Sequence, residues 1–273
     1  MSSTLKGLKY ILALGSDPQN FLGTWWVPYT LSRLPKGQRR KWALRALSLS
    51  PHYFFDTGAN GPLDENLEAA FQLGIRSREK IYDLVLKDAL NADDTVLDYG
   101  CGPGFLAVNT AKHVKAVYAC DISTGALTCA GIINPAKNLT YLRADEHGFS
   151  SIPDGSIDAA YSFAVIQHLT DETFEHVLSN CSRKLKPGGK LILHIQLSDD
   201  AWKTESEWKA DTSLKGKLKF RYGLHCFGRS AEHHVELVEK HGFSDVQIED
   251  LAPEAAAELN GTQAEAILTA RRS

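Results

Sequence analysis

The sequence predicts an α/β fold in which a largely parallel β-sheet is covered by helices on both faces. From residue 95 onwards, short β-rich runs alternate with helical segments, which is the pattern of such a sheet. A glycine-rich turn, VLDYGCGPGF (96–105), directly follows the first strand. Acidic residues stand at the ends of the first three strands, at Asp98, Asp121 and Asp145. Ligands of such folds bind at the carboxyl edge of the sheet, so we expect the functional site there.

The expected elements follow from hydrophobic spacing and from glycine and proline breaks. Helices are expected at 38–49, 104–113, 123–132, 171–185 and 230–241, with helical spacing also over 81–86 and Ser77 as an N-cap. Residues 197–229 are too long for an ordinary connection, so we expect a lid insertion. The expected strands are 95–99, 116–120, 139–143, 157–162, 190–196, 244–249 and 263–269.

Composition indicates an ordinary globular protein, with 43% hydrophobic and 23% charged residues among 273. It has no apolar run of 18 residues, and the apolar run at 10–14 is too short for a signal peptide. The five cysteines form no CxxC pair, which favours reduced thiols and a cytoplasmic location.

Charge is distributed unevenly along the chain. Residues 1–55 carry eight basic residues and one acid, a net charge of +7, whereas the whole chain is −3. The remainder therefore carries −10, which argues against a nucleic-acid partner, because such a partner needs a broad basic face.

The glycine turn is suited to a ligand with a cationic part. Gly100, Gly102 and Gly104 have GxGxG spacing, and Asp98 precedes them by two residues. A carboxylate there would repel a pyrophosphate and attract an ammonium group. Asp121 can accept two hydrogen bonds from a ribose diol, which both NAD and S-adenosylmethionine (SAM) possess. A single acid at a strand end is more often a helix cap or a surface charge, but three in order favour a nucleoside cofactor.

These motifs, together with VYACDIS, LRADEHG, GSIDAAYSFAVIQHLTD and LKPGGKLILHI, resemble class I SAM-dependent methyltransferases. The resemblance covers about residues 75–270 and is strongest to the small-molecule, type 11 group that includes ubiquinone-biosynthesis enzymes. It implies a doubly wound, Rossmann-like sheet of seven strands with the last antiparallel. It also implies that the cofactor-binding residues are Asp98, Tyr99, Gly100, Gly102, Gly104, Asp121, Ile122, Asp145, Glu146 and Phe163.

Within that resemblance, the glycine turn surrounds the methionine part of SAM and Asp121 binds the ribose. Ile122 packs on the adenine, Asp145 accepts from its amino group, and Glu146 supplies a backbone N–H. No group of metal ligands is recognisable, so we expect SAM as the cofactor and no metal.

The methyl acceptor is expected at the other end of the cofactor. His168 follows the fourth strand and is the first candidate for a general base, since a hydroxyl acceptor needs one within hydrogen-bonding reach; a structural role is its alternative. His225, in the insertion, is a second candidate. His194 fits a satisfied core histidine. The fourth strand lacks an NPPY motif and continues as SFAV, which favours a small-molecule acceptor and oxygen methylation.

Residues 1–74 are expected to form a helical arm before the domain at 75–273. The arm is rich in aromatic residues, and three interpretations remain open. It caps an apolar acceptor site, it lies on an anionic membrane through KGQRRKWALRALSL (36–49), as a lipid-like acceptor would require, or it docks on the acidic body. For the whole chain, the alternatives to a methyltransferase are a nicotinamide-dependent oxidoreductase and a non-catalytic SAM-binding partner subunit.

Overall fold

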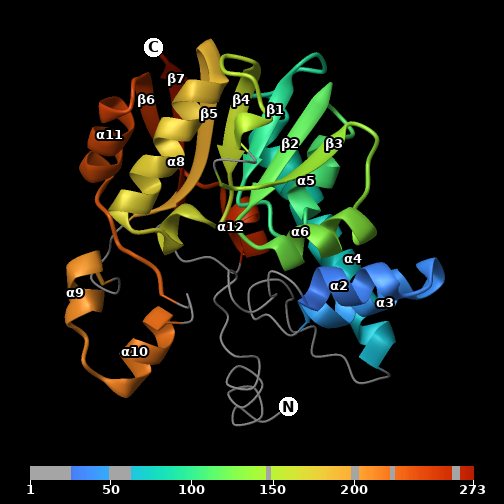
Figure 1. Cartoon of the computed structure of the whole chain (residues 1–273). Coiled ribbons are helices and arrows are strands. Elements are labelled where there is room, and N and C mark those ends of the chain that lie inside the picture. The colour runs from blue at the N-terminus through green and yellow to red at the C-terminus, as the bar shows by residue number, and fades with distance from the viewer. Residues whose placement is uncertain (1–25, 49–62, 146–148, 198–202, 222–224, 260–264) are drawn as a thin grey trace.

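The computed structural model describes residues 26–48, 63–145, 149–197, 203–221, 225–259 and 265–273 (Figure 1). Glu146 and the aromatic residues Trp25, Tyr53, Phe54 and Phe55 lie outside the described residues. In the described part, no helix combines the length and apolar character needed to cross a bilayer.

Seven strands form one sheet in the order β3-β2-β1-β4-β5-β7-β6. β7 runs antiparallel to both of its neighbours, and the other pairs are parallel. The predicted doubly wound sheet with an antiparallel last strand is therefore confirmed. The strands are β1 (Thr95–Tyr99), β2 (Ala116–Asp121), β3 (Leu139–Arg143), β4 (Ile157–Ser162), β5 (Leu185–Gln196), β6 (Phe243–Asp250) and β7 (Glu265–Arg272).

The strand order creates a switch point at the centre of the sheet. The chain moves from β1 to β2 and β3 on one side and then returns to β4 on the other. Asp98 of β1 stands in register with Ala119 of β2 and Tyr161 of β4. Doubly wound folds bind ligands beside such a point, at the carboxyl ends of the strands.

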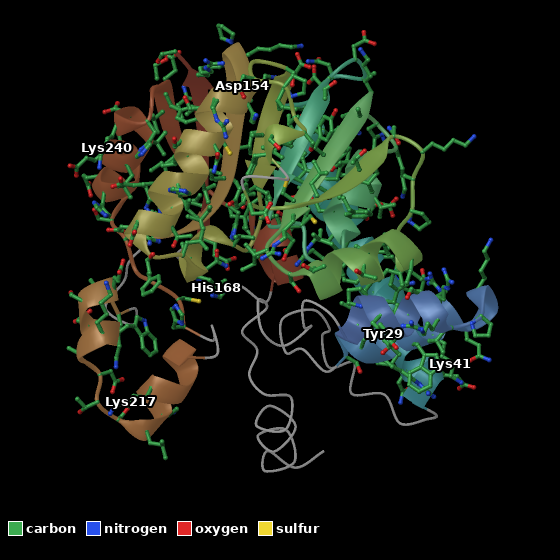
Figure 2. The ribbon with its side chains drawn as sticks, in the orientation of Figure 1. Tyr29, Lys41, Asp154, His168, Lys217 and Lys240 are labelled. Carbon is green, nitrogen blue, oxygen red and sulfur yellow. The ribbon has the colours of Figure 1, made fainter. Side chains whose placement is uncertain are left out.

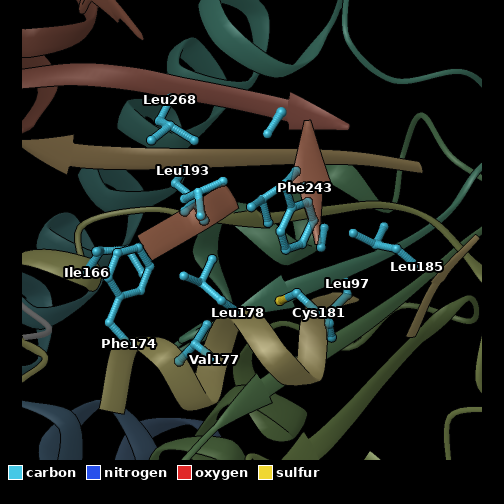
Figure 3. Close-up of a cluster of buried hydrophobic side chains, with 14 of the residues drawn as sticks. Leu97, Ile166, Phe174, Val177, Leu178, Cys181, Leu185, Leu193, Phe243 and Leu268 are labelled. Atoms are coloured by element: carbon cyan, nitrogen blue, oxygen red, sulfur yellow. The ribbon is translucent and has the colours of Figure 1, made fainter. Parts of the chain in front are cut away.

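Helices cover both faces of the sheet (Figure 1). On one face, α8 and α11 close a core that includes Phe174, Leu178 and Leu193 (Figure 3). On the other face, α4, α5, α12 and the π-helical turn η1 pack on a second core around Val96, Tyr161 and Ile192. These elements are α4 (Leu63–Ile81), η1 (Tyr82–Leu86), α5 (Phe105–Thr110), α8 (Asp171–Lys184), α11 (Ala231–Lys240) and α12 (Pro253–Leu259).

The arm and the insertion add helices outside the sheet layers. α2 (Trp26–Arg33) and α3 (Lys36–Leu47) pack on α6 (Thr124–Ile133) through a third apolar cluster. The insertion contains α9 (Glu205–Ala210) and α10 (Leu214–Arg221). α4 spans residue 74, where the boundary between arm and domain is expected.

Three local predictions are corrected. Ser77 is not an N-cap: it is buried within α4, and its hydroxyl donates to the Glu258 carbonyl at 3.1 Å. The helical spacing over 81–86 belongs to a π-helical turn that continues α4. β5 begins at Leu185, five residues earlier than expected, because the chain pairs with β4 already at that residue.

Candidate functional site

The glycine turn requires glycine at two positions for steric reasons. Gly100 and Gly104 have φ values of 81° and 77°, a conformation that L-residues rarely adopt. A Cβ on Gly100 would lie 2.4 Å from Val165 Cγ2, and one on Gly104 would lie 2.2 Å from the Tyr141 hydroxyl. The turn therefore packs directly against the segment after β4 and against β3.

Asp121, at the end of β2, connects the glycine turn to the start of α6. Its Oδ2 accepts from the Gly102 N–H and its Oδ1 from the Ser123 N–H, both at 2.8 Å. Burial raises the pKa of this carboxyl group, and the backbone hydrogen bonds oppose the rise. Because each carboxylate oxygen has two lone pairs, both oxygens retain capacity to accept from a pair of hydroxyl groups.

Asp98 is a buried carboxyl group, only 2% exposed, with no hydrogen-bond partner at Oδ2. Burial raises its pKa to about 8, and the negative charge of Asp121 adds to the rise. A hydrogen bond from Tyr161 and the positive charge of Arg78 oppose it. A cation placed beside Asp98 would compensate its burial, as the sequence predicts for an ammonium group.

Arg78 is a residue that sequence reasoning missed. It lies in α4, and its guanidinium interacts electrostatically with Asp98 and with Glu258. Burial lowers its pKa, and these two carboxylates oppose the decrease. The available signal was a basic residue in the helix that precedes the glycine strand.

The remaining predicted cofactor residues lie at the ends of β1 to β4. Ile122 follows Asp121 and is 37% exposed, which leaves apolar surface beside the ribose-type acid. Tyr99 stacks on Phe149, with ring centroids 5.7 Å apart. Asp145 forms an ion pair with Arg143, with 3.1 Å between Oδ2 and Nε. Phe163 is buried and stacks on His194 at 5.2 Å.

The structure brings His168 together with the segment that carries His225 (Figure 2). The His168 Nδ1 lies 2.7 Å from the His225 carbonyl oxygen. Because a carbonyl oxygen only accepts, Nδ1 carries the proton and Nε2 carries the lone pair of the neutral ring. His225 itself is 8% exposed and packs edge-on against Phe227. Trp208, which sequence reasoning missed, donates from Nε1 to the Cys226 carbonyl at 2.8 Å.

Arg229 fixes this end of the insertion to the domain. Its Nε donates to Asp171 Oδ1 at 2.6 Å, and its Nη1 donates to the Ile166 carbonyl at 3.2 Å. Its Nη2 donates to the Leu169 carbonyl. One buried guanidinium thus holds the residues on both sides of His168 against the insertion.

His194 is buried, as the core interpretation predicts, but only one of its nitrogens has a hydrogen-bond partner. Nδ1 accepts from the Ala164 N–H at 3.3 Å, whereas Nε2 lies 3.8 Å from Glu265 Oε2. Neither Nε2 nor that carboxylate oxygen is hydrogen-bonded, and the same is true of Gln167 Oε1. Together with Asp98 Oδ2, these atoms form a set of buried polar atoms without hydrogen-bond partners along the carboxyl edge of the sheet, from β1 to β7.

Comparison with known proteins agrees with this geometry. A family model described as a methyltransferase domain matches residues 97–193. The ubiquinone biosynthesis O-methyltransferase of Xanthomonas oryzae pv. oryzae is 31% identical over 100 residues, which cover 36% of this chain and 41% of the relative. The N-demethylindolmycin N-methyltransferase of Streptomyces griseus is 27% identical, over 63% of this chain and 78% of the relative.

Among solved structures, the geranyl diphosphate C-methyltransferase of Streptomyces coelicolor superposes with a TM-score of 0.54 over 90% of this chain and 96% of its own. Its sequence is 14% identical, so the likeness concerns the fold. The match to the ubiquinone enzyme spans about two fifths of that relative. Residues 97–193 therefore match a methyltransferase domain. Together with the relatives and the seven-stranded sheet with its glycine turn, this match makes the chain similar to the class I SAM-dependent methyltransferases.

Proposed function

We propose that the protein transfers a methyl group from SAM to a small-molecule acceptor in the cytoplasm, with an oxygen atom as the favoured acceptor. The observation that carries this proposal is the pair of buried carboxyl groups, Asp98 and Asp121, on the two sides of a glycine turn. A dinucleotide would place its pyrophosphate in that turn, where its negative charge opposes ionisation of the buried Asp98 carboxyl group, whereas an ammonium group stabilises the ionised form. Charge therefore favours SAM over a nicotinamide cofactor.

When bound, SAM supplies a methyl group on a positively charged sulfur. Asp98 would bind the ammonium group of its amino-acid part, and Arg78 would bind the carboxylate. Asp121 would accept from the ribose hydroxyls, and the exposed Ile122 would pack on the adenine. Asp145 would accept from the adenine amino group, as the family resemblance implies.

At the acceptor end, His168 would take a proton from a hydroxyl group at Nε2. Its orientation is set by the bond between Nδ1 and the His225 carbonyl, which fixes the tautomer that general-base catalysis requires. The aromatic rings of Trp208 and Phe227 pack against His225 on two sides. The named relatives act on oxygen, nitrogen and carbon in turn, so the base at His168 is the reason for favouring oxygen.

The test is a transfer assay with methyl-labelled SAM and a panel of phenols, carboxylic acids and amines. We expect labelled product from a hydroxyl-bearing class. His168→Ala should lower kcat by about 10²- to 10⁴-fold and leave the Kd for SAM unchanged. The control is His176→Ala, because His176 is exposed on α8. Labelling of amines alone, or full activity of His168→Ala, would contradict the assignment of acceptor and base.

A further inference from the structure

The arm helices α2 and α3 carry exposed cations and exposed aromatic rings. Residues 26–48 contain six basic residues and no acid. Tyr29 is 54% exposed and Trp42 is 42% exposed. The Arg33 guanidinium lies 3.6 Å from the centroid of the Tyr29 ring, and that of Arg45 lies 4.9 Å from a Trp42 ring centroid. Exposed tyrosine and tryptophan rings beside cations are typical of a membrane–water interface.

A second basic surface comes from the insertion. The sequence of α10, LKGKLKFR, carries four basic residues and no acid. Leu214 is 75% exposed, and Lys215 and Lys217 are exposed. Helix α10 is therefore also basic and offers an apolar side chain to the surroundings. Two segments far apart in the sequence are therefore both basic and both expose apolar side chains, although the net charge of the whole chain is −3.

Both basic surfaces lie at the same end of the molecule. In Figure 2, Lys41 and Lys217 lie at the end of the sheet where His168 follows β4. Asp154, which precedes β4, marks the opposite end. The cations of these helices thus stand on either side of the carboxyl edge, where the candidate site lies.

We propose that α2, α3 and α10 form a docking surface for an anionic lipid bilayer, which holds the carboxyl edge of the sheet against the membrane. Cations supply the attraction to anionic headgroups, at about 1 kcal/mol for each lysine or arginine near the surface. Tyr29, Trp42 and Leu214 enter the interfacial layer, as apolar residues of peripheral helices do. A polyanion such as nucleic acid would use the cations but would leave the exposed tryptophan and leucine without a function. The surface is independent of methyl transfer, so it can be tested without knowing the acceptor.

The test is co-sedimentation of the full chain with vesicles of phosphatidylcholine alone and of equimolar phosphatidylcholine and phosphatidylglycerol. We expect binding to the anionic vesicles only. The charge variants are Lys36→Glu with Lys41→Glu, and Lys215→Glu with Lys217→Glu. Each pair should lower the partition coefficient at least about tenfold. The control pair is Lys87→Glu with Lys137→Glu, since both lysines are exposed and precede strands at the opposite edge. We expect it to bind like the wild type.

The apolar contribution is tested with Trp42→Ser and Leu214→Ser, which change exposed side chains and leave the charge unaltered. Combined, they should lower vesicle binding at least about fivefold. Equal binding to both vesicle types, or unchanged binding of the lysine variants, would overturn the proposal. The proposal would also be overturned if the serine variants bound vesicles as well as the wild type does and the wild type bound duplex nucleic acid more tightly than vesicles. Titration of the same variants with SAM reports separately on the cofactor site.

Discussion

Asp98 is the residue whose environment says most about the ligand. Its carboxyl group is buried at the centre of the sheet, Oδ2 has no hydrogen-bond partner, and burial raises its pKa to about 8. At pH 6.5 the free protein therefore holds Asp98 mainly protonated. A bound ammonium group favours the ionised carboxylate, so binding should expel the proton.

This gives a prediction for the cofactor. SAM binding at pH 6.5 should release about one proton from Asp98 for each molecule bound. The measurement is calorimetric titration in buffers of different ionisation enthalpy, in which the observed heat changes with the number of protons released. Asp98→Asn should bind more weakly and release no proton from this position. A binding heat that is the same for wild type and variant in every buffer would refute this role of Asp98.

The same residue makes stability depend on pH. The ordinary pKa of an aspartate is 3.8 and that of folded Asp98 is about 8. The unfolded chain therefore loses this proton first, and the stability contributed by protonated Asp98 falls as pH rises from about 4 to about 8. Asp98→Asn removes this loss, so at pH 8 it should raise the melting temperature by roughly 3 to 6 °C. At pH 3.5 the difference should vanish; the same difference at both pH values would exclude Asp98 as its cause.

At the scale of elements, the glycine turn and the segment after β4 are packed as one unit. Gly100→Ala would combine a strained φ with a Cβ 2.4 Å from Val165. We expect a loss of about 2 to 4 kcal/mol of unfolding free energy and weaker SAM binding. Val165→Ala in the same chain should recover at least about 1 kcal/mol, because it removes the clash and leaves the backbone strain. Denaturant unfolding of the four proteins in this cycle measures the coupling; strictly additive effects would rule out the contact.

The insertion depends on Arg229 for its position. Arg229→Met leaves two carbonyl groups and Asp171 without their guanidinium partner, so we expect a loss of about 3 to 5 kcal/mol. The insertion should also be cleaved faster by a protease. Arg183→Met is the control, because Arg183 is half-exposed on α8 and bonds to Asn180 within that helix. If both variants behave alike, Arg229 does not anchor the insertion.

Local sequence patterns predicted those elements whose bounds are set by neighbouring residues in the sequence. The bounds of β1, β3 and β4 were predicted to the residue, since each strand has a β-rich run bounded by turn residues. The predicted start of β5 is too late. The pairing of the first residues of β5 with β4 overrides the turn that their sequence favours. α12 carried no strong periodic signal and was missed.

The same limit applies to the site. Asp98 and Asp121 could be identified because each stands at the end of a strand beside a glycine turn. Glu265 could not be identified, and the sequence marks Arg78 only as a basic residue in the preceding helix, because α4 and β7 reach this edge only through the assembled sheet. The pairing of His168 with the His225 carbonyl likewise depends on a contact between residues 57 positions apart.

At the scale of the whole molecule, the strand order and the basic helices both mark the carboxyl edge of the sheet. The strand order places the switch point at β1 and β4, and the acidic groups gather there. The basic helices α3 and α10 stand at the same end of the sheet (Figure 2). The two buried carboxyl groups beside the glycine turn and the two basic helices therefore lie at the same edge of the sheet.

Calorimetric titration of the full chain with SAM and with NADH measures whether this edge of the sheet binds SAM. SAM should bind to one site, and NADH should give no binding heat. Asp121→Ala should weaken SAM binding at least about 100-fold, because it removes the acceptor for the ribose hydroxyls. Asp121→Asn should have a smaller effect, because it keeps one carbonyl oxygen. Binding of NADH without binding of SAM, or undiminished SAM affinity in Asp121→Ala, would show that this edge is not a SAM site.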